Sequence, residues 1–330
     1  MSTVRTHGHP PRTATSSTPS ATGTSLTRRA ALATGLLAGV LVVAGCGAGG
    51  EAAAGAEPAA PGAPGESAVP AGDRELSIVA TDTPAYSGPL EIATETLEAD
   101  GWTVDVTYVT DIVQPNNAVS NGEFDYNFFQ HGAYLQTFNR DNGTEVVPLF
   151  YAVGSPAGVY SVTHDSIEDL PDGARIALPV DPANNGRALH LLAGAGLLEL
   201  TEGAQVVSTS QEDITANPRG LEFVEVDQQT LTQTLPDVDA GFLFIRQAVE
   251  MELDPEADAL LFEDDLDAVP YRIVFGGAPD AVGSEKTEAL QAAFQSDEVA
   301  AFYTDFYGDW APLPWDDDPQ AQLADWWTEG

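Results

Sequence analysis

The segment DPANNGRALHLL, residues 181–192, places Arg187 at the start of a stretch whose apolar residues recur at helical spacing. A helix N-terminus attracts anions, because it presents free backbone N–H groups and the positive end of the helix dipole. Asn184 or Asn185 is expected to cap this helix. The guanidinium of Arg187 in the first turn would add a planar fork that holds a carboxylate at two points. These residues leave two interpretations open, a ligand carboxylate or a structural salt bridge to one of the chain's many acids.

Residue patterns that would support catalysis are missing from the sequence. It has no G-x-S-x-G segment, no H-E-x-x-H, and no phosphate-binding loop before its sole lysine, Lys286. His131, His164 and His190 are too widely spaced to predict a zinc site. The acidic stretch EDDLDAV, residues 263–269, lacks the ligand spacing of a calcium loop and is interpreted as solvated surface. We therefore expect no enzyme activity, no metal and no cofactor.

The elements that must position Arg187 follow a strand and helix alternation. Strands are expected at residues 76–82, 102–109, 124–129, 145–150, 157–163, 174–180, 221–226, 240–245, 259–263 and 270–277. Helices are expected at residues 89–101, 131–140, 184–198, 284–295 and 297–307, with shorter ones between other strands. This alternation predicts an α/β fold with parallel sheets flanked by helices. The acidic aromatic end of the chain, from Trp310 onward, is expected to dock on the folded body.

The first 73 residues have the composition of an export signal followed by a tether. Arg28 and Arg29 precede an apolar run at residues 30–45, which is shorter than the ~20 residues of a spanning helix. Residues 1–45 are therefore expected to be a lipoprotein signal peptide, exported by either the twin-arginine or the general secretory route. The run ends in Val-Ala-Gly before Cys46, the only cysteine, which we expect to carry a lipid. The Gly/Ala/Pro-rich residues 46–73 are expected to form a flexible tether.

The charge balance of the chain excludes one class of partner. It has 12 Lys and Arg against 51 Asp and Glu, a formal net charge of -39. Such a surface repels phosphate backbones, so no nucleic acid is expected among its partners.

Several segments together resemble the methionine-binding lipoproteins of the MetQ/NlpA type, which are substrate-binding proteins of ABC importers. The segments are FDYNFFQHGAYL (124–135), SPAGVYS (155–161), IEDLPDGARIALPVDPANNGRALHLLAGAGLLEL (167–200), NPRGLEFVEVD (217–227), VPY (269–271) and QSDEV (295–299). The resemblance runs in register over residues 76–307. It implies a two-lobed periplasmic-binding-protein-like α/β fold, with two crossing segments and a ligand cleft between the lobes. Lobe 1 would comprise residues 74–156 and 271–330, and lobe 2 residues 157–270.

The resemblance also implies roles for individual residues. Arg187 matches the arginine of the family's D-P-x-N-x-G-R segment, which binds the ligand's carboxylate, and Asn185 stands beside it. Phe129, His131 and Tyr134 match the wall around the ligand's side chain. Without the resemblance, the two aromatic residues would be interpreted as core and the histidine as a capping residue.

Other positions depart from the family pattern. Ile112 stands where the family has an aromatic residue shortly before Pro-Asn. Phe244 stands where the family has an asparagine, and Arg272 or Ile273 replaces a second one. Because those asparagines hold the polar end of an amino-acid ligand, their replacement leaves open whether the ligand is methionine, another carboxylate or a dipeptide.

The leading hypothesis is a lipid-anchored, extracytoplasmic binding protein that captures methionine or a related small amino-acid or dipeptide ligand. Its expected partners are that ligand, an ABC permease with its ATPase subunit, and the cell membrane through the lipid on Cys46. Two alternatives stay open. One is an extracytoplasmic enzyme on the same scaffold. The other is a sensor or adhesin that has lost transport, with Phe244 filling the cleft.

Overall fold

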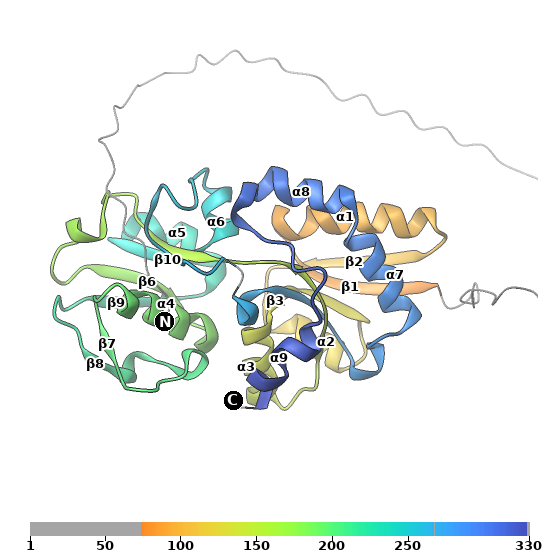
Figure 1. The fold of residues 1–330 in the computed structure, drawn as a ribbon, viewed down its shortest axis with the longest axis horizontal. Helices are drawn as coiled ribbons and strands as arrows, with labels where there is room; N and C mark the ends of the chain where they lie inside the picture. The colour runs from red at the N-terminus through yellow and green to blue at the C-terminus, as the bar shows by residue number, and fades with distance from the viewer. Residues whose placement is uncertain (1–73, 267, 329–330) are drawn as a thin grey trace, which may run out of the picture. The chain divides into compact units, whose positions relative to one another are not determined.

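Strands from both ends of the described chain share one sheet. The computed structural model describes residues 74–266 and 268–328, the last four as backbone only. The first sheet has the order β2-β1-β3-β12-β4, in which β1 is parallel to β2 and β3 while β12 is antiparallel to β3 and β4 (Figure 1). Its strands are β1 (Glu75–Thr81), β2 (Thr103–Val109), β3 (Tyr126–His131), β4 (Val147–Val153) and β12 (Ile273–Gly277).

The middle of the chain forms the second sheet, in the order β11-β5-β10-β6-β9. Here β6 is parallel to β9 and β10, while β5 is antiparallel to β10 and β11. Its strands are β5 (Ala157–Tyr160), β6 (Arg175–Pro179), β9 (Glu222–Val226), β10 (Ala240–Phe244) and β11 (Ala259–Phe262). A separate hairpin, β7 (Glu199–Leu200) with β8 (Ile214–Ala216), lies outside both sheets.

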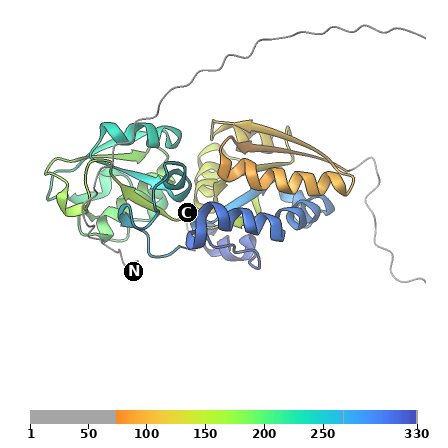
Figure 2. The ribbon, with the colours of Figure 1, turned by 90° about the horizontal axis from the view of Figure 1, so that it is seen from above.

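Helices cover both faces of the first sheet. Helices lie on both sides of the sheet in Figure 2. Apolar residues of α1, α7 and α8 join one buried cluster with that sheet, and residues of α2 and α3 join another. The bounds of these helices are α1 (Pro84–Ala99), α2 (Gln114–Ser120), α3 (Gly132–Asn142), α7 (Glu285–Phe294) and α8 (Asp297–Tyr307). Burying apolar side chains on both faces of a sheet is what stabilises a layered α/β fold.

The second sheet has a core of its own. Leucines of its helices, such as Leu189 and Leu231, pack with Phe242 of β10 in a single buried cluster. Its helices are α4 (Pro182–Gly194), α5 (Leu231–Thr234) and α6 (Ile245–Glu250).

Two short segments connect the sheets. Residues 154–156 lead from β4 to β5, and residues 263–272 lead from β11 back to β12. Below they are called the first and second crossing segments. The second contains a 3-10 turn at Val269–Tyr271, and residue 267 within it is not among the residues that the structure describes.

The structure corrects three expectations about individual elements. Both sheets are mixed rather than parallel. Strand β12 in the first sheet and β5 in the second each enter from the other sheet, and no helical crossover forces them to be parallel to their neighbours. Helix α1 begins at Pro84, with Pro89 inside it. The cap of α4 is Asp181, whose side chain accepts from the backbone N–H of Asn184, and Pro182 occupies the first turn. Arg187 therefore lies in the second turn rather than the first.

The C-terminal segment docks on the first sheet, as expected. The indole Nε1 of Trp315 donates to the carbonyl of Ala152 at 2.7 Å, and the Gln320 side chain donates to the carbonyl of Pro148 at 2.8 Å. Pro312 accepts from the backbone N–H of Gly154, in the first crossing segment, at 2.7 Å. The segment ends in a helix that the sequence did not predict, α9 (Pro319–Thr328).

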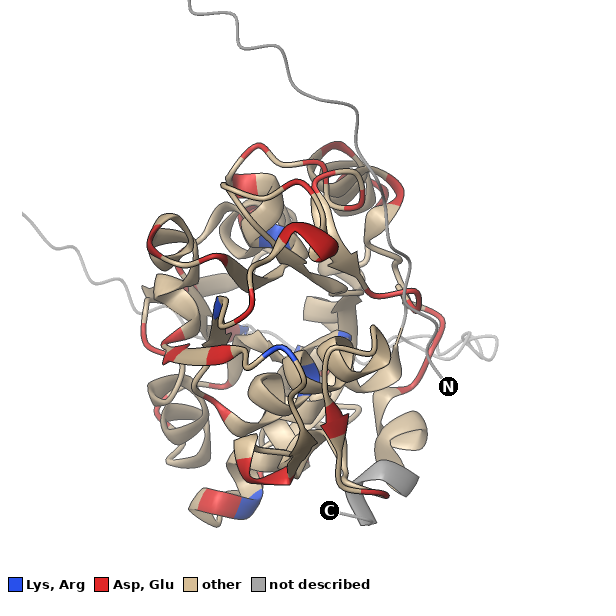
Figure 3. Cartoon of the chain, turned by 90° about the vertical axis from the view of Figure 1, so that its left-hand side faces the viewer, with Lys and Arg blue, Asp and Glu red and all other residues tan. Residues whose placement is uncertain are grey.

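Acidic residues are spread over the elements of both sheets, with few Lys and Arg among them (Figure 3). No helix among residues 74–266 and 268–328 combines the length and hydrophobicity that a membrane span requires. The expected signal peptide, the tether and Cys46 lie outside the described residues.

Candidate ligand-binding site

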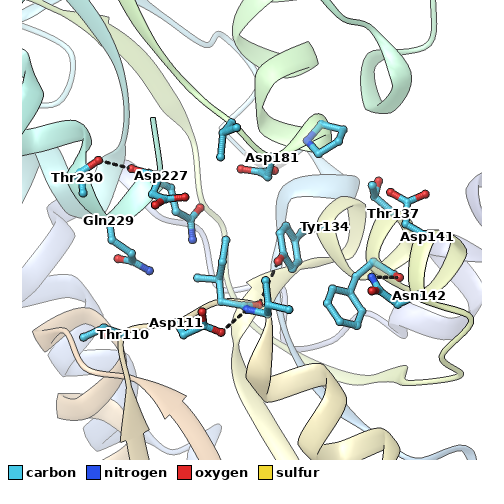
Figure 4. Close-up of a pocket in the computed structure, with 16 residues that line it drawn as sticks. Thr110, Asp111, Tyr134, Thr137, Asp141, Asn142, Asp181, Asp227, Gln229 and Thr230 are labelled. Atoms are coloured by element: carbon cyan, nitrogen blue, oxygen red, sulfur yellow. Dashed lines mark hydrogen bonds between the residues drawn. The ribbon is translucent and has the colours of Figure 1, made fainter. Parts of the chain in front are cut away.

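A cavity of about 540 Å³ opens between elements of the two sheets. We call it the acidic cavity; it is lined by residues 110–113, 134, 137–138 and 141–142 on the side of the first sheet, and by residues 180–182 and 227–230 on the side of the second (Figure 4). Four of these residues are aspartates and none is Lys, Arg or His. Its volume falls within the range of small-molecule binding sites.

A chain of hydrogen bonds crosses from α3 to α4 beside this cavity. The backbone N–H of Tyr134 donates to Nδ1 of His131 at 3.1 Å, so that nitrogen carries no hydrogen. Nε2 of His131 lies 2.9 Å from Oδ1 of Asn184, and it is therefore the donor. Burial, together with the nearby charge of Arg187, lowers the pKa of His131 to about 3. The histidine is therefore neutral, with its hydrogen held between the two helices.

The chain of hydrogen bonds ends on Asp181. The side chain and the backbone N–H of Asn184 both donate to Oδ1 of Asp181, at 2.9 and 3.0 Å. The other oxygen, Oδ2, is buried and has no hydrogen-bond partner among the described residues. Burial raises the pKa of Asp181 to about 6, although the hydrogen bonds from Asn184 and the charge of Arg187 oppose that rise. Asp181 thus lines the acidic cavity with one satisfied and one unsatisfied oxygen.

Arg187 lies against both crossing segments. Its Nε donates to Oε1 of Glu263 at 2.7 Å and its Nη2 to Oε2 at 2.5 Å, a two-point ion pair. Nη2 also donates to the carbonyl of Ser155 at 2.7 Å. The guanidinium carbon stands 3.7 Å from the centre of the Tyr271 ring. Ser155 belongs to the first crossing segment, and Glu263 and Tyr271 to the second.

One edge of the Arg187 guanidinium is not used. Nη1 is buried and has no hydrogen-bond partner within the described chain. Arg187, Glu263 and Tyr271 also line a second cavity, of about 440 Å³, which we call the arginine cavity; it is bounded by residues 187, 190–191, 193–194, 200, 206, 263–265, 268 and 271. The guanidinium of Arg187 is thus a cation held in a fixed position, and its Nη1 can still donate hydrogen bonds.

Of the other residues predicted to surround the ligand, some line the acidic cavity and some lie behind its lining. Ile112 and Tyr134 line the acidic cavity, and the Tyr134 hydroxyl donates to the carbonyl of Ile112 at 3.0 Å. Phe129 packs edge-on to Tyr134 at 5.8 Å between ring centres, in a cluster with Ile112. His131 and Phe129 line neither cavity.

Two predicted residues lie away from both cavities. Asn185 is buried and donates to the carbonyl of Pro179 at 2.9 Å, which fixes the start of α4 on the end of β6. Phe244 is buried in the core of the second sheet, edge-on to Phe242, so it fills neither cavity.

Neither position considered for the second replaced asparagine lines the acidic cavity or the arginine cavity. The guanidinium of Arg272 donates to the side chains of Asp317 and Gln322 at 2.7 and 2.6 Å, in the C-terminal segment. Ile273 begins β12 and is buried.

Sequence reasoning missed Asp181 and Glu263. The Asp-Pro pair at 181–182 is a helix-start signal, because Asp is a favoured cap and Pro a favoured first residue. Glu263 gave no such signal, and its stretch was interpreted as solvated surface. That interpretation is wrong for Glu263, whose side chain is 16% exposed and paired with Arg187. Its partner lies 76 residues away in sequence.

Metal-binding groupings are absent from the part of the chain that the structure describes. No group of three or more His, Cys, Asp or Glu side chains among residues 74–266 and 268–328 is arranged to hold a metal ion.

A family model described as NlpA lipoprotein matches residues 77–314. Among curated relatives, the probable D-methionine-binding lipoprotein MetQ of Vibrio cholerae is 34% identical over 212 residues, 64% of this chain and 78% of that protein. The methionine-binding lipoprotein MetQ of Bacillus subtilis is 32% identical over 246 residues, 74% of this chain and 89% of that protein.

Two solved structures are also similar to this chain, both in sequence and in fold. A nutrient-binding protein from Burkholderia cenocepacia bound to methionine is 31% identical with a TM-score of 0.68, and the match covers 72% of this chain and 99% of that one. A putative methionine-binding lipoprotein from Bacillus subtilis gives 31% identity and a TM-score of 0.67, covering 73% of this chain and 98% of that one. These likenesses confirm the predicted two-lobed, periplasmic-binding-protein-like α/β fold. The chain belongs to the NlpA lipoprotein family.

Proposed function

We propose that this protein is the lipid-anchored, extracytoplasmic substrate-binding protein of an ABC importer, and that it captures methionine or a related small amino-acid or dipeptide ligand. The acidic cavity is the observation that carries the proposal, because elements of both sheets line it and its volume suits a small molecule. The relatives named as methionine-binding support the choice of ligand class. The protein would hand its ligand unchanged to the permease, and ATP hydrolysis would belong to the separate ATPase subunit.

The proposed carboxylate site is Arg187. Glu263 and Ser155 occupy Nε and Nη2, which leaves the two N–H groups of Nη1 for a ligand oxygen. The side chain of a helical residue points back towards the N-terminus of its helix, and Arg187 lies near enough to Asp181 to oppose the rise in its pKa. A zwitterion that reached both residues would lie along the first turns of α4, between the arginine cavity and the acidic cavity.

The proposed movement is a rotation of two lobes about the crossing segments. Residues 74–156 with 271–330 would form one lobe, and residues 157–270 the other. Contacts between α3 and α4, above all the hydrogen bond from His131 to Asn184, would open and close. Because Arg187 contacts both crossing segments, a ligand on its free edge would favour the closed arrangement by the difference in its affinity for the two states.

Titration calorimetry on the full-length chain tests the carboxylate site with L-methionine and with methionine amide, which lacks the carboxylate. We expect Arg187→Lys to weaken L-methionine by about 1.5–3 kcal/mol, the contribution of a hydrogen bond to a charged group. The lysine keeps the positive charge opposite Glu263, but it lacks the planar fork. Binding of the amide is expected to change little.

Equal weakening of both ligands would show that Arg187 acts only on the folded structure. No heat from L-methionine, D-methionine, methionine dipeptides or other amino acids would contradict the function itself. Urea unfolding of the wild type and the lysine variant is the control for folding.

A further inference from the structure

The aspartates of the acidic cavity are not equivalent. Asp111, Asp141 and Asp227 are exposed. Asp111 accepts from the backbone N–H groups of Val113 and Gln114, and Asp141 pairs with Arg140. Water and local partners therefore satisfy these three carboxylates. Their contribution to the cavity is a negative field that no cation in the lining offsets.

Asp181 differs because its Oδ2 is buried and makes no hydrogen bond in the described chain. A buried carboxylate oxygen without a partner is costly, since it has lost its water and gained nothing in exchange. The cost falls if a cation with hydrogen-bond donors enters the cavity and reaches that oxygen. A primary ammonium group supplies both the charge and the donors.

Two more buried polar atoms of the same lining lack partners. They are Oγ1 of Thr137, on α3, and Nε2 of Gln229, between β9 and α5. Thr137 is only 5% exposed. Its hydroxyl can accept a second N–H from an ammonium group, whereas Gln229 can only donate through Nε2 and so needs an oxygen. The three atoms come from both sides of the cavity, so one ligand that satisfies them would draw the two sides together (Figure 4).

The rest of the lining suits an apolar group. Ile112, Tyr134 and Phe138 present hydrocarbon surface, and Phe138 is buried in a cluster with Tyr134. A ligand with an ammonium group at one point and a short apolar chain beside it would match this distribution, whereas an anionic group inside the cavity would be repelled by its four carboxylates.

We infer that the acidic cavity binds the ammonium group of the ligand, with Oδ2 of Asp181 as its main acceptor and Thr137 as a second. The ligand class is therefore a small primary amine with an apolar chain. The inference rests on the proposed function in one respect, which is the choice of amino acids as the first amines to test. Recognition of the amine would then depend on the negative charge of Asp181, and recognition of the carboxylate on the positive charge of Arg187.

The test is titration calorimetry on the full-length chain with three related ligands. L-Methionine carries both charged groups, methionine amide only the ammonium, and 4-(methylthio)butanoate only the carboxylate. We compare the wild type with Asp181→Asn, because asparagine still caps a helix and Oδ1 can still accept from Asn184. The matched control is Asp165→Asn, the same loss of charge at an exposed residue outside both cavities.

In the wild type we expect L-methionine and its amide to bind, and 4-(methylthio)butanoate to bind roughly 30-fold more weakly or not at all. Asp181→Asn should weaken L-methionine and the amide by roughly 30-fold, the effect of removing one member of a buried charge pair. The same variant should bind 4-(methylthio)butanoate no more weakly than the wild type does, because that ligand loses only a repulsion. A purely structural role for Asp181 would weaken all three.

Each other outcome is decisive. The inference is wrong if Asp181→Asn binds L-methionine within about threefold of the wild type and of Asp165→Asn, the range of a surface charge effect. It is also wrong if 4-(methylthio)butanoate binds the wild type as tightly as L-methionine, although the proposed function would then stand. If putrescine or n-butylamine binds through Asp181 while no amino acid does, the function is wrong and the inference stands. If neither amines nor amino acids bind, both are overturned.

Discussion

His131 and Asp181 illustrate how neighbours determine the state of a single residue. The tautomer of His131 is fixed because one ring nitrogen accepts from Tyr134 and the other donates to Asn184. Asp181 is held at Oδ1 by Asn184, which leaves Oδ2 to the cavity. Loss of contact with water moves their pKa values in opposite directions, because it disfavours the charged form of each.

His131 gives the folded protein a pH dependence that can be isolated. Its folded pKa of about 3 lies below the unfolded value of 6.5. As the pH falls through that window, the unfolded chain takes up a proton that the folded protein does not, so stability is lost. Between about pH 7 and pH 5 we expect this group to cost the wild type about 2 kcal/mol relative to His131→Gln. The measurement is the urea midpoint of both proteins at the two pH values.

Asp181 acts in the opposite sense over part of this range. Its raised pKa means that the folded protein takes up a proton first, so Asp181 adds stability as the pH falls from about 6 to 3.8. Because Asp181 is present in both proteins, its contribution cancels in the comparison. Parallel pH profiles for wild type and His131→Gln would contradict the prediction.

Sequence reasoning identified Arg187 but not what surrounds it. The resemblance pointed to the arginine, and the Asp-Pro signal for the start of its helix was available in the sequence. Its position in the second turn followed from the cap at Asp181 rather than at Asn184 or Asn185. Its pairing with Glu263 could not be predicted, because the two residues meet only once β11 has joined the second sheet.

At the scale of elements, helix α4 is positioned by a close approach to a neighbouring turn. A Cβ at Gly186 would collide with the backbone carbonyl oxygen of Val206, in the 3-10 turn Val206–Ser208, and come within 3.0 Å of that of Thr209. This close approach fixes the position of α4 relative to the turn, and with it the positions of Asp181 and Arg187 beside the two cavities. Glycine is required here because backbone leaves no room for a methyl group, and no side chain can rotate away.

Gly186→Ala is therefore expected to destabilise the protein although alanine is the better helix former. Overpacking costs about 1–3 kcal/mol, against a gain of about 1 kcal/mol in helix propensity. The control is Gly88→Ala in α1, where the added Cβ would meet the ring of Phe302, a half-buried side chain that can move. Urea unfolding should show a clear loss for the first variant and a small change for the second. Equal effects would mean that α4 can shift away from the turn.

The order of strands and helices could be predicted because apolar periodicity records which face of each element is buried. The elements missed lack that signal. Helix α6 follows β10 directly at Ile245, with no breaker between them, and its buried residues include Arg246 and Gln247, so no apolar stripe marks it. Helix α9 lies within an acidic sequence and docks through a few side chains. The direction of β12 could not be predicted either. It depends on how the chain re-enters the first sheet from the second, and no local sequence pattern indicates this.

At the scale of the whole molecule, charge is the dominant feature. The formal net charge is -39 on 330 residues, and few Lys or Arg lie among the acidic residues (Figure 3). Like charges therefore repel one another across the folded protein. The same field would hold amines near the acidic cavity and keep anions away. Ligand capture and stability should therefore both depend on ionic strength.

Salt is expected to stabilise the protein by screening this repulsion. The Debye length falls from about 10 Å at 0.1 M to about 3 Å at 1 M, so most of the gain should come at low salt and then level off. Thermal unfolding in NaCl from about 0.02 M to about 1 M, at constant pH, measures it. A rise in Tm that is linear up to the highest concentration would indicate solvent exclusion instead of screening.

The docking of the C-terminal segment determines where a reporter can be attached. Its bonds run to Pro148 and Ala152 of β4 and to Gly154 just beyond. A dye on the exposed Ala321 of α9 would therefore travel with the first sheet as one rigid piece. A second dye on the exposed Glu202, in the β7–β8 hairpin, would travel with the other half. Energy transfer between the two dyes would follow each cycle of capture and release in single molecules.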